Sequence, residues 1–258
     1  MAFRIFKLMT GFLLFIVLSL TTSSLAKGTT RPDPNLVVLK VDNLRLPKVQ
    51  SEVHITLTSF RNGFEHSKKE LRVLNDVNLD SLVIFKGSKI RGQKVLSKGD
   101  KMWFYSPRSR RAVRITPLQK LMGEASYGDL SQMRWNEDYF AAFDEKSPQE
   151  TIENKKCWKL ELKAKSSRAV YKRILLWVTV KEEWPLIAYF FVASGKHLKT
   201  LHFKLPRRTA GEQDSFVRTL IFQDSIRQGR ETIMVLNKIT VKKLSKKMFT
   251  LTGLQLKL

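Results

Sequence analysis

The segment 99–115, GDKMWFYSPRSRRAVRI, holds the side chains of this sequence that are best suited to binding a ligand. Four large apolar residues, Met102 to Tyr105, run into arginines at positions 108, 110, 111 and 114. Aromatic rings beside arginines can stack bases of single-stranded nucleic acid. The same pattern is typical of a hairpin whose strand is apolar and whose rim is positively charged, and guanidinium groups bind phosphate through paired hydrogen bonds.

Residue types that perform catalysis or bind metals are present but not in useful spacings. The four histidines form no metal-ligand spacing with carboxylates or with Cys157, and His197 and His202 fall on opposite faces of one predicted strand. No nucleophile elbow, phosphate loop or zinc-protease motif occurs. We therefore expect no enzyme, no metal site and no cofactor.

The charge and the N-terminus narrow the choice of partner. The 47 Lys+Arg against 23 Asp+Glu give a net charge of +24, which attracts polyanions or anionic membrane surfaces. Residues 1–26 have the pattern of a secretory signal peptide: Arg4 and Lys7, an apolar run over 8–20, and small residues before a predicted cleavage after Ala26. The alternative is an uncleaved N-terminal anchor. Because an exported chain rarely meets nucleic acid, we expect no nucleic-acid partner and favour lipid headgroups or other envelope polyanions.

The elements that must position these residues are mostly strands. Residues 27–33 are polar and predict a flexible N-terminus, residues 34–46 predict a short helix, and one domain is expected over 34–258. Period-two alternation and turn signals predict strands at 52–60, 66–75, 80–86, 93–97, 100–105, 111–116, 138–144, 149–153, 157–164, 170–180, 185–194, 197–205, 216–224 and 231–242. Many short strands joined by hairpins indicate an antiparallel sheet that is closed or strongly curved.

The hydrophobic pattern predicts how the sheet is covered. In 157–164 the apolar residues share one face, which is typical of a sheet with one buried and one wet face. In 171–193 both faces are apolar, so we expect cover on both sides, with protein on one side and a bound apolar ligand as an option on the other. The segment 117–136 carries Met122 and two glycines, and it predicts either a movable flap or a fixed loop.

Six stretches together resemble one family: VDNLRLP (41–47), KGDKMWFYSPRSRRAVRI (98–115), LMGEASYGDL (121–130), CWKLELKA (157–164), YKRILLWV (171–178) and SGKHLKTLHF (194–203). They are similar to the LolA-like superfamily, in its branch of outer membrane lipoprotein-sorting proteins. The resemblance implies a mainly β fold: a curved, incomplete antiparallel β-barrel with short helical lid elements over an apolar concave face. It also implies a periplasmic carrier that holds acyl chains of lipoproteins or other lipids for transfer towards the outer membrane.

Two groups of candidate site residues follow from these patterns. The candidates for lining a lipid cavity are Trp103, Phe104, Tyr105, Met122, Trp177, Tyr189 and Phe191. The candidates for a basic rim are Arg108, Arg110, Arg111 and Arg114. Alternation separates Trp103 and Tyr105 from Met102 and Phe104, but a register error of one residue exchanges the two faces, so the inward pair stays open.

The partners implied are acyl chains of lipoproteins or lipids, with an inner-membrane export complex and an outer-membrane receptor as further candidates. Two other functions remain open. One is a non-carrier accessory subunit of an inner-membrane export pump, and the other is a module that binds envelope polyanions.

Overall fold

The structure, a computed structural model, describes residues 31–45, 49–78, 80–87, 90–116, 118, 120–122, 124–130, 134–166, 169–204 and 216–256. The chain divides into two compact units, Met1–Arg31 and Pro32–Leu258, and the helices and strands of the described residues all belong to the second unit. The predicted signal peptide and residues 27–30 of the predicted flexible N-terminus lie outside the described residues.

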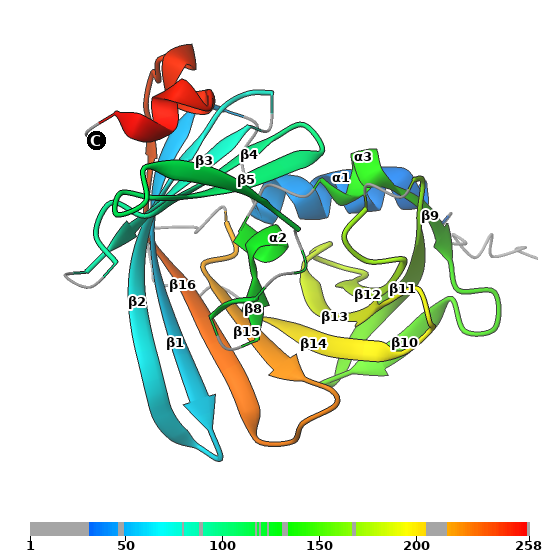
Figure 1. Ribbon diagram of the computed structural model, residues 1–258. Coiled ribbons are helices and arrows are strands. Elements are labelled where there is room, and N and C mark those ends of the chain that lie inside the picture. Colours follow the sequence, from blue (N-terminus) through cyan, green and yellow to red (C-terminus); the bar gives the residue numbers. More distant parts are fainter. Residues whose placement is uncertain are drawn as a thin grey trace, which may run out of the picture. The chain divides into compact units, whose positions relative to one another are not determined.

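One large antiparallel sheet dominates the second unit (Figure 1). Its strands are β1 (Ser51–Arg61), β2 (Phe64–Asn75), β3 (Ser81–Lys86), β4 (Lys94–Lys98), β5 (Lys101–Ser106), β6 (Arg111–Ile115), β9 (Tyr139–Phe143), β10 (Gln149–Ile152), β11 (Lys155–Ala164), β12 (Arg173–Thr179), β13 (Pro185–Phe191), β14 (His197–Lys204), β15 (Thr219–Asp224) and β16 (Arg230–Val241). The strand order is β10-β11-β12-β13-β14-β15-β16-β1-β2-β3-β4-β5-β6, and β9 pairs with β11. Within the described residues the end strands β6 and β10 do not pair, so the sheet stays open. This confirms the predicted incomplete antiparallel barrel.

Helices and short strands complete the unit. They are α1 (Pro34–Arg45), β7 (Lys120–Met122), β8 (Ala125–Ser126), α2 (Tyr127–Leu130), α3 (Trp135–Asp138) and the 3-10 helices η1 (Lys246–Phe249) and η2 (Thr252–Gln255). Among the described strands, β7 pairs only with β8. The flap region predicted over 117–136 thus contains β7, β8, α2 and the start of α3. No helix in the described ranges combines the length and apolar composition needed to cross a bilayer.

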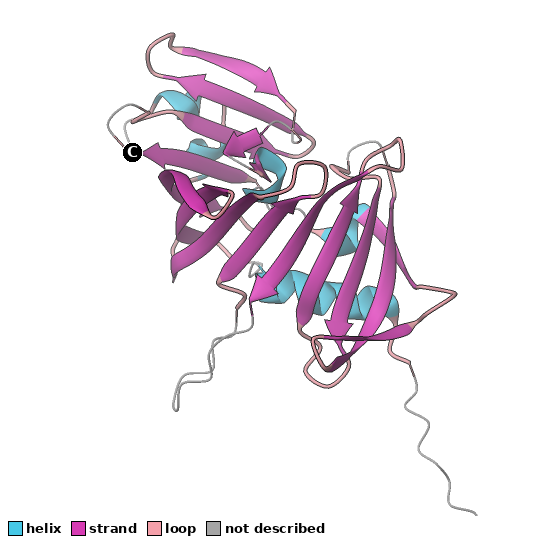
Figure 2. Cartoon of the chain, turned by 90° about the horizontal axis from the view of Figure 1, so that it is seen from below, coloured by secondary structure: helices cyan, strands magenta, loops and turns pink. Residues whose placement is uncertain are grey.

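The helix α1 forms where the sequence predicts it. Asp33 accepts a hydrogen bond from the backbone N–H of Asn35 at 2.8 Å, which caps the first turn, and Pro34 suits the first helical position. The side chains of Val37, Val38 and Val41 are buried against the sheet. Figure 2 shows α1 lying along one face of the strands. We call this face the inner face and the opposite one the outer face.

Each face has its own apolar core. The inner cluster joins α1 and α3 to inward residues of nearly every strand from β1 to β16, including Trp158, Leu160 and Leu162 of β11. On the outer face, the C-terminal cluster comprises Leu74, Leu82, Ile84, Leu96, Tyr105, Leu244, Phe249 and Leu254. A smaller outer cluster contains Cys157, Trp177 and Leu186. Strands β12 and β13, whose sequences are apolar on both faces, therefore contribute buried side chains to both the inner cluster and the smaller outer cluster.

The C-terminal cover of the outer face was not predicted from the sequence. Phe249 of η1 and Leu254 of η2 pack on outward residues of β3, β4 and β5. The buried ammonium of Lys94 donates to the carbonyl oxygens of Leu254, at 2.9 Å, and of Leu256. These bonds satisfy a buried charge and fix η2 to β4, since a buried cation is tolerated only when it is hydrogen-bonded.

We predict that Phe249→Ala lowers the free energy of unfolding by about 3–5 kcal/mol, because it empties a fully packed aromatic site. Leu251→Ala is the matched control, since Leu251 is 49% exposed in the same segment and its truncation should cost less than about 0.5 kcal/mol. Equilibrium urea denaturation measures both. Equal effects would show that η1 does not contribute to the outer core.

Candidate functional site: the inner face and its helical cover

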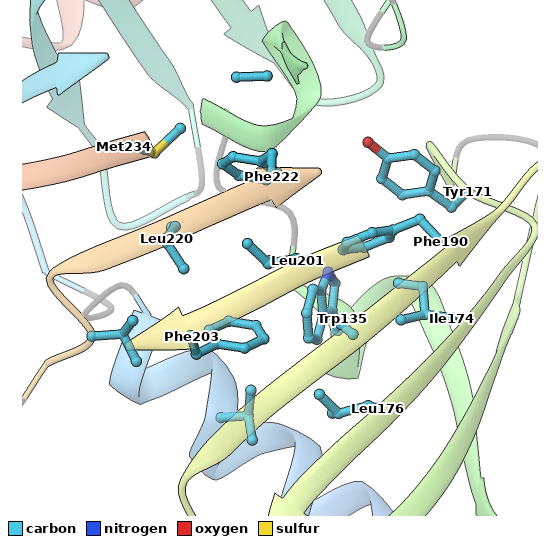
Figure 3. Close-up of a cluster of buried hydrophobic side chains, with 14 of the residues drawn as sticks. Trp135, Tyr171, Ile174, Leu176, Phe190, Leu201, Phe203, Leu220, Phe222 and Met234 are labelled. Carbon is cyan, nitrogen blue, oxygen red and sulfur yellow. The ribbon is translucent and has the colours of Figure 1, made fainter. Parts of the chain in front are cut away.

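The inner face of β12 to β16 carries a cluster of buried apolar side chains (Figure 3). Period-two alternation places every second residue of these strands on this face. Its buried members on these strands are Ile174, Leu176, Val178, Ala188, Phe190, Leu201, Phe203, Leu220, Phe222, Met234 and Leu236. In the described part of the chain, α1, the short helices α2 and α3 and the small β7–β8 sheet cover this surface.

Trp135 of α3 fills the centre of this surface (Figure 3). Its ring packs edge-on against Phe190, with 5.9 Å between centroids, and against Phe203, with 6.3 Å. The side chain is fully buried, yet its Nε1–H has no acceptor among the described residues. An unsatisfied buried donor costs about 1–3 kcal/mol. The tryptophan therefore occupies the inner face with one polar group unpaired.

Polar contacts with α1 hold α3 in this position. The guanidinium of Arg45 stacks on the Trp135 ring, 3.9 Å from its centroid, and pairs with Asp42 at 3.2 Å. Asp42 also accepts a hydrogen bond from the backbone N–H of Asn136 at 2.9 Å. Burial raises the pKa of Asp42, although Arg45 and the backbone donors act in the opposite direction. Burial likewise lowers the pKa of Arg45. The buried Arg45–Asp42 ion pair within α1 thus holds α3 through the stack on Trp135 and the hydrogen bond from Asn136.

A second buried ion pair ties the α2 segment to the sheet. Asp129 of α2 and Lys199 of β14 form a salt bridge, and their side chains are only 3% and 4% exposed. The second carboxylate oxygen of Asp129 accepts a hydrogen bond from the Tyr171 hydroxyl at 2.9 Å. Ser126 donates to the carboxylate through its backbone N–H, at 2.7 Å, and through its hydroxyl, at 2.8 Å. Every oxygen of this buried carboxylate therefore has a donor.

The surroundings of Lys199 are aromatic. Its ammonium lies 5.0 Å from the ring centroid of Phe222, 5.3 Å from that of Tyr171 and 5.7 Å from that of Phe190. Burial, together with the Asp129 carboxylate, raises the pKa of Tyr171 well above its usual range, so this hydroxyl stays a donor. Hydrogen bonds and aromatic rings of the protein therefore compensate for the water that both charges lose. The pair joins α2, part of the helical cover, to the apolar inner face beneath it.

The predicted cavity residues divide between the two faces. Phe104 and its neighbour Met102 belong to the inner cluster, whereas Trp103 and Tyr105 pack in the C-terminal cluster on the outer face. Trp177 and Tyr189 pack in the smaller outer cluster. Phe191, also predicted to line the cavity, stacks with His197 at 5.1 Å on the same outer face. The side chain of Met122 lies outside the described part of the structure.

The reason for this division is strand register. Ile174, Leu176 and Val178 take the inner face of β12, which turns Trp177 outwards. The inner-face positions that sequence reasoning missed are Trp135, Asp129 and Lys199. The sequence did contain an indication for Lys199. It lies two residues before Leu201 and four before Phe203, so alternation places it on the same, apolar face of the strand.

The outer aromatics form a structural row. Trp177 packs on Tyr189, and Tyr189 on His197, each with 4.8 Å between centroids. The indole N–H of Trp177 donates to Glu150 at 2.8 Å, and Lys159 pairs with the same carboxylate at 2.7 Å. The Lys159 hydrogen bond lowers the pKa of Glu150. These contacts account for the aromatic side chains without a ligand.

Two pockets among the described residues lie at the hairpin ends of the sheet, and the residues that pack on Trp135 do not line them. One of about 290 Å³ is lined by Ser59, Arg61, His66, Arg227 and their neighbours, near the hairpin ends of β1, β2, β15 and β16. Another of about 530 Å³ lies beside Gly63, Gln228 and Gly229 at those ends. The inner face itself is packed by Trp135 and α1. Within the described ranges, no three His, Cys, Asp or Glu side chains are grouped so that they could hold a metal ion.

The predicted basic rim is exposed. Arg108 and Arg110 lie in the turn between β5 and β6, and Arg111 and Arg114 lie on β6. All four side chains face solvent.

Comparison with solved structures defines the class of fold. A LolA superfamily protein from Nitrosomonas europaea matches with a TM-score of 0.76 and 24% identity, over 85% of this chain and 98% of that one. A DUF1329 family protein from Desulfovibrio piger matches with a TM-score of 0.68 and 20% identity, over 87% and 100%. A domain assigned as an outer membrane lipoprotein-sorting protein from Vibrio parahaemolyticus gives 0.67 and 20%, over 86% and 97%. The chain therefore has a LolA-like fold.

A protein-family model covers much of the same region. The model is described as "-like: Uncharacterized protein" and matches residues 78–255, so the chain belongs to that family. A search of curated proteins finds no match.

We predict a pH dependence of stability that originates at His197. Burial lowers the pKa of His197 below its usual 6.5, so the unfolded chain binds this proton more readily than the folded one. The stabilisation is complete above pH 6.5 and is lost as the pH falls through the lowered folded-state pKa. In urea denaturation at about pH 7.5 and about pH 5.5, His197→Phe should therefore show a smaller loss on acidification than the wild type. Identical pH slopes would contradict this assignment.

Proposed function

We propose that the chain is a non-enzymatic carrier that binds acyl chains of lipoproteins or other lipids on the inner face of its sheet. The observation that carries this proposal is the apolar surface around Phe190, Leu201 and Phe203, which is covered by helices and the two-stranded β7–β8 sheet rather than by another large sheet. Each methylene removed from water contributes about 0.8 kcal/mol, so a long acyl chain binds there without specific polar contacts.

The described conformation is the closed state of this carrier. Trp135 occupies the part of the inner face that an acyl chain would contact. When an acyl chain replaces the Trp135 ring, the apolar face stays shielded from water. An ester or amide carbonyl of the cargo would supply the acceptor that Trp135 Nε1 lacks among the described residues. Opening then requires movement of α2 and α3, and the flap predicted over 117–136 contains α2 and the start of α3.

The ion pair Asp129–Lys199 sets the energy of opening. Separating a buried ion pair costs several kcal/mol, because each charge loses its ionic partner in an apolar site. The cover therefore stays closed until cargo or a receptor compensates for this loss. The predicted signal peptide and the LolA-like fold support work in the periplasm, with delivery towards the outer membrane.

The first test is the mass of bound cargo. We expect native mass spectrometry of the natively purified full chain to show co-purifying lipid or acylated peptide. Phe203→Ala on the inner face should reduce this bound fraction by at least about tenfold, equivalent to about 1.4 kcal/mol. Trp177→Ala, an equally drastic truncation on the outer face, should retain it. A wild-type chain that is reproducibly empty would contradict a carrier and favour the accessory-subunit function.

The second test concerns the closed cover. Asp129→Asn removes the carboxylate charge with which Lys199 pairs, so we expect faster release of a pyrene-labelled fatty acid, by at least about tenfold for each 1.4 kcal/mol of closing energy lost. Stopped-flow fluorescence measures the rate. Glu161→Gln, which removes the Arg173 pair on the outer side of β11 and β12, is the control and should leave release unchanged. Equal release rates in the wild type and Asp129→Asn would show that the pair does not hold the cover.

A further inference from the structure

Strand β6 is one edge of the sheet that the described strands form. Among the described strands it pairs only with β5, and the side chains from Arg111 to Arg114 are exposed. A free edge presents unpaired backbone N–H and C=O groups that can template another strand.

The apolar inner face ends at β6, where the side chain of Val113 is exposed. Cross-strand pairs place Val53, Val73, Val83, Val95, Phe104 and Val113 in one row across six neighbouring strands. The first four of these side chains are buried, while Val113 at the end of the row is 58% exposed. Ile115 shares this side of β6 and packs against the inner cluster. The apolar side chains of a strand added to β6 could therefore pack beside Val113 and extend this row.

The charge around the edge has one sign. The sequence from Lys101 to Gly123 contains no Asp or Glu. Arg108, Arg110, Arg111 and Arg114 have no ion-pair partner among the described residues, and Arg91 lies in the neighbouring loop whose Gly92 approaches the Pro107 ring. The backbone φ of Arg110 is +51°, a conformation that glycine adopts at lower cost. The turn thus carries an arginine where glycine would be less strained.

This charge excludes one occupant and favours another. Two copies of this chain that paired through β6 would bring Arg111 and Arg114 of each close to those of the other, and like charges on paired strands are destabilising. An acidic strand has the opposite balance, because its carboxylates can pair with Arg111 on one side of β6 or with Arg114 on the other while the backbone gains hydrogen bonds to β6. Charge complementarity therefore selects an extended acidic segment over a second copy.

We propose that β6 is a docking edge for an extended acidic segment of a partner protein, which adds to the sheet as a further strand. Backbone hydrogen bonds to β6 supply affinity, and the apolar side chains of the segment continue the row that ends at Val113. The arginines favour a negatively charged segment over a positively charged one, and their attraction increases the association rate. This surface is distinct from the inner-face site and does not depend on the cargo.

The experiment uses the full chain and two fluorescent peptides of about eight residues, matched to the usual length of a strand, one alternating Val and Glu and one alternating Val and Lys. In fluorescence anisotropy we expect binding of the Glu peptide only, weakened by added salt. Hydrogen–deuterium exchange should show protection confined to the amides of β5 and β6. The double variant Arg111→Glu/Arg114→Glu should weaken binding at least about tenfold.

The matched control is Lys181→Glu/Lys196→Glu, which changes the net charge equally at exposed sites elsewhere. This control should bind the Glu peptide as the wild type does. An equal loss in both double variants would overturn the proposal, because only the total charge would then matter. Binding of both peptides alike would overturn it as well. If vesicles containing anionic phospholipid protect 111–115 while the Glu peptide does not, the arginines belong to a lipid-headgroup site and the proposal is wrong.

Discussion

An open antiparallel sheet with two apolar faces is the constraint on which the rest of this structure depends. The sheet must keep water from both faces, yet the described chain supplies few residues outside the strands to do so. The inner face receives α1 and the short α2 and α3, and part of the outer face receives η1 and η2. Because dispersion and burial are non-directional, apolar contact alone would let such short segments slide. Buried polar joints remove that freedom.

Three joints perform this task, and they differ in what they hold. Lys94 holds the C-terminal turn through backbone carbonyls. The Arg45–Asp42 pair holds α3 through Trp135, and Asp129–Lys199 holds α2 on the sheet. A cation bonded to carbonyls is part of a static core. An ion pair that spans two elements has a second, separated state, which suits a cover that opens.

The positive charge of the chain is distributed so that it does not disturb these interiors. The described inner face carries Lys199 as a paired charge, whereas the arginines of the β5–β6 hairpin are at the rim of the sheet. Charge at the rim repels other copies of the edge and keeps those arginines out of the apolar core. A carrier of apolar cargo requires this separation, since a strongly charged face would not bind acyl chains and an uncharged edge would aggregate.

Local patterns in the sequence determined the elements and their order. Alternation over 52–60 and 157–164 predicted β1 and β11, and Asp33-Pro34 predicted the start of α1, because capping and side-chain period are properties of a few adjacent residues. The tertiary structure alone decided which face each element turns inwards. Trp103 and Trp177 point outwards although their neighbours point inwards, since a shift of one residue reverses a strand. Asp129 and Lys199 are 70 residues apart, and Phe249 meets β5 only after the C-terminus folds back. Such contacts depend on the register of all strands in the sheet, and a pattern of a few adjacent residues does not determine that register.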